Sequence, residues 1–320
     1  MALSCLLQKV CGIGFVVLIF FPIVATPLNA EDFLLKNRRD KAVRCGGSLR
    51  CSNCRAESAE EREYKEAISI RRNIQLSKAQ SEIKFGRAFK ELGIEGSIII
   101  YDARNKKFYE HNSARNSQAF FPASTYKILN TLIALETGVI RDDVTVLTWD
   151  GIKRDIDVWN QDTNLRQAFK NSTVWFYQVL ARKIGNERMQ SFINKIGYGN
   201  QQIGTAENID KFWLEGLLQI TPKQQIEFLN KVHDGKLPFS QRNLNLVKDM
   251  MIVEQTPDYT LRGKTGWVTS TNPNIGWFVG YLEQNNKVYY FATNIDMPNV
   301  KLAPARIKVT RRCLQMLGLF

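Results

Sequence analysis

Ser124 and Lys127 are the residues of this chain whose types and spacing best suit chemistry. Residues 128–137 carry apolar side chains at helical spacing and stop at Gly138, so we expect a helix with Ser124 in its first turn and Lys127 on the same face. A serine hydroxyl becomes a nucleophile when a base lies within hydrogen-bond reach. A lysine can be that base only where its surroundings remove its charge at neutral pH. The pair predicts an activated nucleophile, although alone it also fits an ordinary helix start.

Three further motifs follow this pair along the chain. The segment 171–174, Asn-Ser-Thr-Val, places Ser172 at a predicted helix start. The segment 198–200, Tyr-Gly-Asn, forms a turn after an amphipathic helix, and 262–267, Arg-Gly-Lys-Thr-Gly-Trp, leads into a β-rich run. Ser-x-x-Lys followed by a hydroxyl motif and a Lys-Thr-Gly strand is the arrangement of serine β-lactamases and penicillin-binding proteins.

The particular forms of these motifs resemble those of the class D (oxacillinase-type) β-lactamases. The resemblance covers about residues 85–320 and includes Phe-Trp-Leu-Glu-Gly at 212–216 and Gly-Trp-Phe-Val-Gly-Tyr at 276–281. It implies an α/β fold, the serine β-lactamase/penicillin-binding fold. An antiparallel sheet from both chain ends is covered by terminal helices, an all-helical subdomain is inserted, and the active site lies between the two parts.

The hydrophobic periods predict elements in an order that suits this fold. The sheet is expected from strands at 97–102, 108–109, 261–267, 275–283 and 288–294, covered by helices at 81–92 and 304–317. Residues 60–80 fit a charged helix, and residues 123–251 are mostly helical. We expect Lys264 on an edge strand that faces the start of the Ser124 helix.

The resemblance makes Ser124 the acylation nucleophile and Lys127 the general base of a β-lactam hydrolase. The backbone N–H of Ser124, in the first helical turn, can face a developing oxyanion. The resemblance implies that the second oxyanion donor is the backbone N–H of Trp267. With only His111 and His233 in the chain, neither in a triad-like motif, a histidine base is not expected.

Lys127 is expected to be modified to N6-carboxylysine. An apolar neighbourhood formed by Val174, Trp213 and the flank around Phe121 would desolvate the amine and lower its pKa, so that it can add carbon dioxide. The resulting carbamate accepts protons from Ser124 and later from the deacylating water. The Trp213 indole N–H, a group that only donates, suits this anion, and plain core packing is the alternative role of Trp213.

The remaining candidate residues bind substrate. Ser172 is either the N-cap of the helix that follows it or a proton relay to the β-lactam nitrogen, and both roles are compatible. Lys264, Thr265 and Gly266 would line the cleft, with a cation and a hydroxyl for the substrate carboxylate. The resemblance places a carboxylate-binding arginine at Arg306, whose fork suits a carboxylate, with a solvated helix-end arginine as the alternative.

Composition limits the other functional classes. The chain has 320 residues, 44% of them hydrophobic and 23% charged, and a formal net charge of +13. Without an aromatic-interleaved basic stripe or a nucleic-acid motif, we expect no nucleic-acid partner. No metal or separate cofactor is expected, apart from the carbon dioxide of the lysine carbamate. The sequence leaves the oligomeric state and the antibiotic spectrum open.

The N-terminal region predicts export. Lys9 precedes an apolar segment, 10–25, and a small residue, Ala30, so residues 1–30 fit a signal peptide, with an uncleaved anchor as the alternative. Residues 31–80 are expected to be a cysteine-containing extension and 81–320 the β-lactamase domain, periplasmic or secreted and free of the membrane after cleavage. The cysteines retained after cleavage allow three disulfide pairings: Cys45, Cys51, Cys54 and Cys313.

Two other functions share these motifs. A penicillin-binding transpeptidase or carboxypeptidase would be acylated but deacylate slowly, and Val174 and Trp213 argue against it. A β-lactam sensor would use the same domain for signalling, but such receptors add several membrane spans and a metalloprotease segment, and this chain has no His-Glu-x-x-His motif.

Overall fold

A six-stranded antiparallel sheet organises the chain. The computed structural model describes residues 59–320, so the predicted signal peptide, most of the predicted extension and Cys45, Cys51 and Cys54 lie outside the described residues. The strand order is β2-β1-β8-β7-β6-β5. The strands are β1 (Gly96–Asp102), β2 (Lys107–His111), β5 (Ile252–Gln255), β6 (Tyr259–Val268), β7 (Ile275–Gln284) and β8 (Lys287–Asp296). Both ends of the described chain therefore build one sheet, as predicted.

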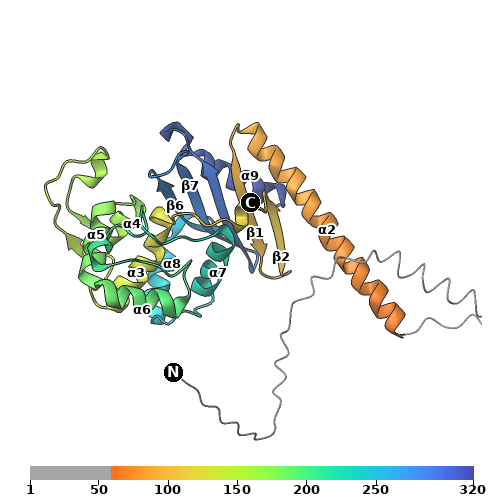
Figure 1. Ribbon diagram of the computed structural model, residues 1–320, viewed down its shortest axis with the longest axis horizontal. Coiled ribbons are helices and arrows are strands. Elements are labelled where there is room, and N and C mark those ends of the chain that lie inside the picture. Colours follow the sequence, from red (N-terminus) through yellow and green to blue (C-terminus); the bar gives the residue numbers. More distant parts are fainter. Residues whose placement is uncertain (1–58) are drawn as a thin grey trace, which may run out of the picture. The chain divides into compact units, whose positions relative to one another are not determined.

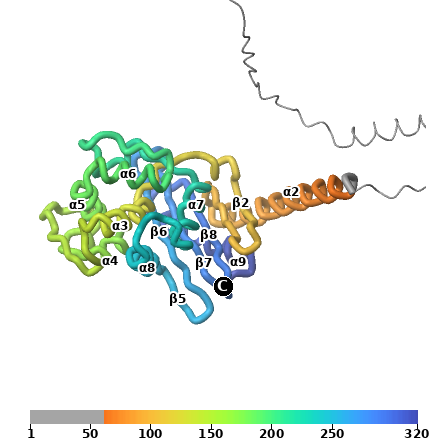
Figure 2. The backbone as a smooth tube through the Cα atoms, turned by 90° about the horizontal axis from the view of Figure 1, so that it is seen from below, coloured from red at the N-terminus to blue at the C-terminus, as the bar shows by residue number. Residues whose placement is uncertain are grey.

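Helices cover both faces of this sheet (Figures 1 and 2). Helix α2 (Ala59–Glu91) and helix α9 (Ala305–Met316) pack on one face. The other face meets α7 and the inserted helical region. The inserted helices are α3 (Lys127–Glu136), α4 (Leu165–Lys170), α5 (Val174–Ile184), α6 (Asn186–Ile196), α7 (Pro222–His233) and α8 (Gln241–Met250). A small pair, β3 (Val146–Leu147) with β4 (Thr163–Asn164), interrupts this helical region and had no clear sequence signal.

Burial on both faces explains why the sequence predicts the central strands well. The first eight residues of β7, from Ile275 to Leu282, are all buried, because this strand has β6 and β8 as neighbours and helices on both faces. In β1, Ile98 and Ile100 face α2 and α9, whereas Ile99 faces the helical region. Such continuous apolar runs mark strands that are covered on both sides.

The two helices predicted at 60–80 and 81–92 are one continuous helix, α2. It therefore crosses the domain boundary that the sequence placed after residue 80. Its last three turns bury Phe85, Ala88 and Phe89 against the sheet at helical spacing. Residues 62–80 are exposed almost throughout, which agrees with their charged sequence. Within residues 59–320, none of the helices combines the length and hydropathy needed to cross a bilayer.

Two expectations about the sheet and the cysteines were wrong. Strand β6 is not the edge strand, because β5 pairs outside it. Pairing with β5 stops at Arg262, however, so from Lys264 onward β6 pairs only with β7. Cys313 is a free thiol, fully buried between α9 and the sheet, so the predicted pairings, each of which uses Cys313, do not form.

Candidate active site

The candidate nucleophile lies in a tight turn that leads into a buried helix. Ser124 belongs to a 3₁₀ turn, Ala123–Tyr126, and α3 begins directly after it at Lys127. The sequence predicted one α-helix from Ser124 on, so the first turn is tighter than expected. All ten residues Lys127–Glu136 except Glu136 are buried, which explains the continuous apolar sequence. The turn thus holds a hydroxyl at the edge of the core.

The Lys127 ammonium group points back at this hydroxyl. Its Nζ donates a hydrogen bond of 2.7 Å to Ser124 Oγ. Lys127 is completely buried, and Ser124 is 9% exposed. Burial, followed by repulsion from Lys264, lowers the pKa of Lys127 well below its ordinary value. The neutral amine that this favours has a lone pair for the serine proton, which is the requirement deduced from the sequence.

Ser172 and Lys264 face this pair from two other parts of the chain. Lys264 Nζ donates hydrogen bonds to Ser172 Oγ and, at 3.1 Å, to the Thr265 carbonyl oxygen. Burial and the nearby Arg306 lower the pKa of Lys264 to about 7. Ser172 is not the N-cap that the sequence suggested, because Thr173 occupies that position and α5 starts at Val174. Ser172 is therefore free to act through its side chain.

Strained backbone supports both serines. Ala123, directly before the nucleophile, has φ 47°, and Ser172 has φ 54°. Residues other than glycine adopt this left-handed region at a cost of about 1 kcal/mol or more. Strained backbone of this kind clusters at functional sites in proteins.

Strand β6 runs directly beside the nucleophile turn. A Cβ atom at Gly266 would lie 3.1 Å from the Pro122 carbonyl oxygen and 3.1 Å from Thr125 Cγ2, so a larger residue would push the strand and the turn slightly apart. Gly266 also accepts a 2.6 Å hydrogen bond from Arg306 Nη1. The sequence predicted that Gly266 lines the cleft, and the structure adds this close contact with the turn.

Arg306 extends the group of buried cations at β6. Burial lowers its pKa to about 10. Its Nε atom is buried without a hydrogen-bond partner among the described residues. Lys127, Lys264 and Arg306 form no ion pair with a carboxylate of residues 59–320. The site is therefore electropositive and has donors to spare for an anion.

Trp213 lies buried behind the nucleophile turn. Its ring stacks on Tyr126 at a centroid distance of 5.6 Å, and its carbonyl oxygen accepts a 2.9 Å hydrogen bond from the Ala123 N–H. The indole Nε1–H is buried and has no partner among the described residues. A buried donor without an acceptor is costly, so this N–H is available for a ligand or a modified side chain.

The Tyr-Gly-Asn motif fixes the segment that carries Trp213. The side chain of Asn200 donates to the Leu217 carbonyl oxygen at 2.8 Å and accepts from the Gln219 N–H at 3.1 Å. At Gly199, with φ 57°, a Cβ atom would lie 2.2 Å from the Gln219 carbonyl oxygen. The motif therefore holds residues 217–219 in place behind the nucleophile turn through backbone contacts.

The structure also assigns positioning roles that sequence reasoning missed. Gln225 on α7 donates a 2.9 Å hydrogen bond to Thr125 Oγ1, which holds the nucleophile turn. Trp277 Nε1 on β7 donates to the Phe121 carbonyl oxygen at 3.0 Å. The Lys127 ammonium lies 5.2 Å from the centre of the Tyr177 ring. Only Trp277 had a signal, its motif at 276–281, and all three contacts join segments that are distant in sequence.

Two more of the predicted site residues, Thr265 and Trp267, lie on β6, and the two histidines lie in ion pairs elsewhere. Thr265 is half-buried between Lys264 and Gly266, and Trp267 is half-buried with a buried indole N–H that has no partner among the described residues. His233 pairs with Asp234 and Glu283, and His111 with Glu82. Neither histidine contacts the serines. Among the described residues, no group of His, Cys, Asp and Glu side chains could hold a metal ion.

Comparisons with known proteins agree with this geometry. Residues 96–315 match the penicillin binding protein transpeptidase domain family. Beta-lactamase OXA-48 of Klebsiella pneumoniae is 41% identical over 227 residues, which cover 71% of this chain and 85% of the relative. The crystal structure of a class D β-lactamase, YbXI from Nostoc, is 71% identical with a TM-score of 0.73 and covers 74% of this chain and 99% of its own.

A second solved structure agrees. The class D β-lactamase FUS-1 (OXA-85) from Fusobacterium nucleatum subsp. polymorphum is 42% identical with a TM-score of 0.71, over 73% of this chain and 97% of its own. The matched range 96–315 includes the sheet, the inserted helices and the four motifs. The chain belongs to the class D β-lactamases, within the wider penicillin-binding transpeptidase fold.

Proposed function

We propose that this protein hydrolyses the β-lactam amide of penicillins and related antibiotics through an acyl-enzyme on Ser124, and so confers resistance to them. The observation that carries this proposal is the 2.7 Å hydrogen bond between Ser124 Oγ and the fully buried Lys127 Nζ. Burial keeps this amine from holding a proton as strongly as a solvated lysine does. A buried amine and a partly exposed hydroxyl at this distance form a base and nucleophile pair.

In acylation, the Ser124 oxygen attacks the β-lactam carbonyl carbon while its proton moves to the base. The developing oxyanion would be stabilised by the backbone N–H groups of Ser124 and Trp267. Their proximity is supported by Gly266, whose backbone lies against the Ser124 turn. The C–N bond of the ring then breaks, and Ser172 would relay a proton to the leaving nitrogen. The contact between Lys264 Nζ and Ser172 Oγ supports this role, because it holds the hydroxyl in the cleft.

The substrate carboxylate would bind to Lys264, Thr265 and Arg306. These residues bring two cations and a hydroxyl together at the same part of β6. Penicillins and cephalosporins carry one carboxylate next to the fused ring nitrogen, and an anion here would supply the counter-charge that the described residues lack. The guanidinium of Arg306 keeps a buried, unpartnered Nε donor for that purpose.

For deacylation, we propose that Lys127 is N-carboxylated. A neutral amine adds carbon dioxide with loss of one proton, and the carbamate supplies an anionic base with two acceptor oxygens. Two observations fit this group: Lys127 is fully buried with a lowered pKa, and the buried Trp213 Nε1–H has no acceptor among the described residues. No metal is required for any of these steps.

The rival within the same fold is a penicillin-binding transpeptidase, which is acylated but deacylates slowly. Turnover distinguishes the two functions. We expect a catalytic amount of the protein to hydrolyse a large excess of a penicillin, with a steady-state rate that continues after the first equivalent. A single burst of one equivalent, followed by a stable acyl-protein in the mass spectrum, would instead show a transpeptidase or a sensor.

The nucleophile is tested with the same assay. Ser124→Ala should abolish both hydrolysis and covalent labelling by a fluorescent penicillin, because the alanine side chain has no oxygen to acylate. Ser81→Ala is the matched control, since Ser81 is also a buried serine but lies on α2, away from the cleft. Labelling that persists in Ser124→Ala would contradict the assignment.

Export remains a proposal that rests on the sequence of residues 1–30. A periplasmic or secreted enzyme meets the antibiotic before it reaches its targets in the cell envelope. Fractionation of cells that express the full chain, with mass spectrometry of the N-terminus, tests it. We expect a mature chain that begins at Glu31 outside the cytoplasm, and a membrane-bound chain of full length would favour the anchor.

A further inference from the structure

A cavity lies along β6 at the proposed carboxylate site. It has a volume of 570 Å³, within the usual range for ligand pockets, and Ser124, Lys127 and Ser172 do not line it. Its walls come from α4, the end of α8, and the strands β5, β6 and β7, together with α9. Lys264 and Thr265 are the residues that this cavity shares with the candidate active site.

The cavity opens where β5 leaves β6. Pairing between these strands stops at Arg262, and the cavity follows β6 from Gly263 to Thr265. Gly266, the next residue, contacts the turn that carries Ser124. Residues of a strand are spaced by about 3.3 Å, so Gly263 lies about 10 Å from Gly266 along the strand. Lys264 and Thr265, the proposed carboxylate-binding residues, therefore form the end of the cavity nearer to the nucleophile turn.

The lining combines an apolar floor with unpaired positive charge. Phe169, Ile252 and Ile307 contribute apolar surface. Arg166, also in the wall, is already paired with Asp143 at 2.5 Å and Asp249 at 2.7 Å.

Lys170, in the last turn of α4, differs from Arg166. Its side chain is exposed and forms no ion pair or hydrogen bond with the described residues. The other cation of the lining, Lys264, lies 5.6 Å from the centre of the Phe169 ring and likewise meets no carboxylate. The cavity thus suits an apolar group that ends in an anion.

We propose that this cavity is a subsite for the substituent next to the carboxylate of a bicyclic β-lactam, and that Lys170 selects an anionic end on that substituent. The proposal rests on the proposed function. With the β-lactam carbonyl at Ser124 and the carboxylate at Lys264 and Thr265, a substituent on the neighbouring ring carbon extends along β6 toward Gly263. A chain of a few atoms then reaches the cavity.

The test uses three cephalosporins that share one acyl side chain. At the 3-position they carry a hydrogen atom, a carboxylic acid on a short thioether, or the methyl ester of that acid. Dissociation constants are measured by calorimetry on Ser124→Ala, which binds without reacting. We expect the acid to bind about 2- to 5-fold more tightly than its ester, which is the usual strength of a partly solvated ion pair. This ratio should fall toward one at 0.5 M salt because the charges are then screened.

Variants of Lys170 decide the role of its charge. In the Ser124→Ala background, Lys170→Gln should make the dissociation constants of the acid and the ester equal. Lys170→Glu in the same background should make the acid the weaker ligand. Lys195→Gln is the matched control, because Lys195 is an exposed lysine in the last turn of α6 and does not line the cavity. Gln167→Trp, which fills the cavity from α4, should weaken both substituted compounds about tenfold and leave the unsubstituted one unchanged.

The outcomes separate this inference from the proposed function. An acid-to-ester ratio that Lys170→Gln leaves unchanged, or a Gln167→Trp effect equal for all three compounds, overturns the subsite. Failure of the wild-type protein to turn over penicillin overturns the proposed function instead. That second result comes from steady-state hydrolysis and does not depend on the dissociation constants.

Discussion

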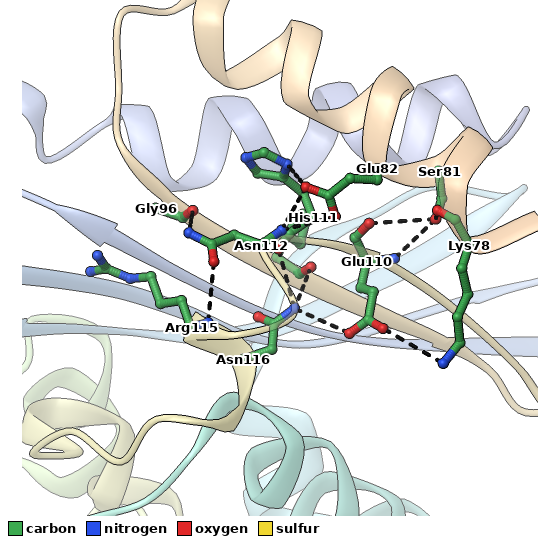
Figure 3. Close-up of polar contacts among 10 residues, drawn as sticks. Lys78, Ser81, Glu82, Gly96, Glu110, His111, Asn112, Arg115 and Asn116 are labelled. Carbon is green, nitrogen blue, oxygen red and sulfur yellow. Dashed lines mark hydrogen bonds and ion pairs between the residues drawn. The ribbon is translucent and has the colours of Figure 1, made fainter. Parts of the chain in front are cut away.

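The active-site cleft and the polar cluster where α2 meets β2 treat their charges in opposite ways. In the polar cluster, Lys78 lies 4.0 Å from Glu110, and His111 lies 2.8 Å from Glu82 (Figure 3). Arg115, at the edge of the same cluster, pairs with Asp296 at 2.7 Å. Each basic group has a carboxylate. In the cleft, the buried cations have none among the described residues.

This difference distinguishes a structural region from a binding site. In the cluster, Glu82 accepts hydrogen bonds from the Asn112 N–H (Figure 3). Asn116 donates to the Ile98 carbonyl oxygen. The Glu82 bond fixes α2 to the end of β2, and both bonds form without a ligand. Buried cations without a counter-charge destabilise a fold by several kcal/mol per ion in general, so they persist where an anionic substrate or modification compensates them.

Loss of the Lys127 base is expected to have the largest effect on activity. Lys127→Ala removes the base and should lower kcat by about 10²- to 10⁴-fold, the usual contribution of general base catalysis. Lys78→Ala, which removes a paired lysine of the polar cluster, is the control and should leave kcat unchanged. Steady-state hydrolysis of a penicillin measures both. Equal losses in the two variants would show that the unpaired lysine has no special role.

The carbamate is tested by bicarbonate. Removal of carbon dioxide at mildly acidic pH should lower the wild-type rate, and added bicarbonate should restore it, because protonation of the amine opposes carboxylation. Trp213→Ala should need more bicarbonate and accumulate acyl-protein on Ser124, since the anion loses its buried donor. The readouts are the rate across bicarbonate concentrations and mass spectrometry of quenched samples. A wild-type rate indifferent to bicarbonate would favour a free lysine base.

The dependence of kcat/KM on pH tests the charge of Lys264. Its pKa is lowered to about 7, so the free enzyme loses this positive charge as the pH rises through that value. Substrate carboxylate binding needs the charged form, and kcat/KM should therefore fall about tenfold per pH unit above this limb. Lys264→Arg, which keeps the charge, should move the limb to higher pH. A limb at the same pH in Lys264→Arg would assign it to another group.

Stability shows the opposite dependence on Lys264. A lysine whose pKa is lowered on folding binds fewer protons in the folded state than in the unfolded state between about pH 7 and its ordinary pKa of 10.5. Its contribution to stability therefore rises with pH across this window and is flat below it. The charged form of Lys264, which binds the anion, therefore lowers the stability of the fold at low pH unless an anion is bound.

A smaller effect is expected in the polar cluster. Glu82→Gln removes the ion pair with His111 and keeps the side-chain length, so thermal unfolding should show a loss of about 0.5–1.5 kcal/mol. The kcat/KM for penicillin should not change, because these contacts form without substrate. A loss of activity in the folded variant would mean that the cluster also shapes the cleft.

The smallest effect is expected for removal of the N-terminal region. A chain that begins at Ser81 keeps Glu82 and Phe85, which hold α2 to the sheet, and loses residues that are exposed where the structure describes them. It should hydrolyse penicillins at close to the full rate. Activity lost from a folded chain of this length would assign residues 31–80 a role in shaping the site.

The nucleophile motif, the strands and the family could all be predicted from the sequence. Apolar runs such as Ile275–Leu282 can be read because burial on both faces leaves no polar alternation. The Ser124–Lys127 pair can be predicted because a spacing of three residues within one helical turn brings the two side chains together. Local spacing and local burial were sufficient in both cases.

The tertiary structure alone decided what surrounds these residues. The sequence could not place β5 outside β6, bury Cys313 as a free thiol, or make Ser172 precede the helix cap. Nor could it show that Lys127, Lys264 and Arg306 share a region without carboxylates. Several of those facts depend on contacts between distant segments, such as the contact of Lys264 with Ser172, 92 residues away along the chain. A pKa or a cavity depends on the sum of such contacts, which no local pattern of residues records.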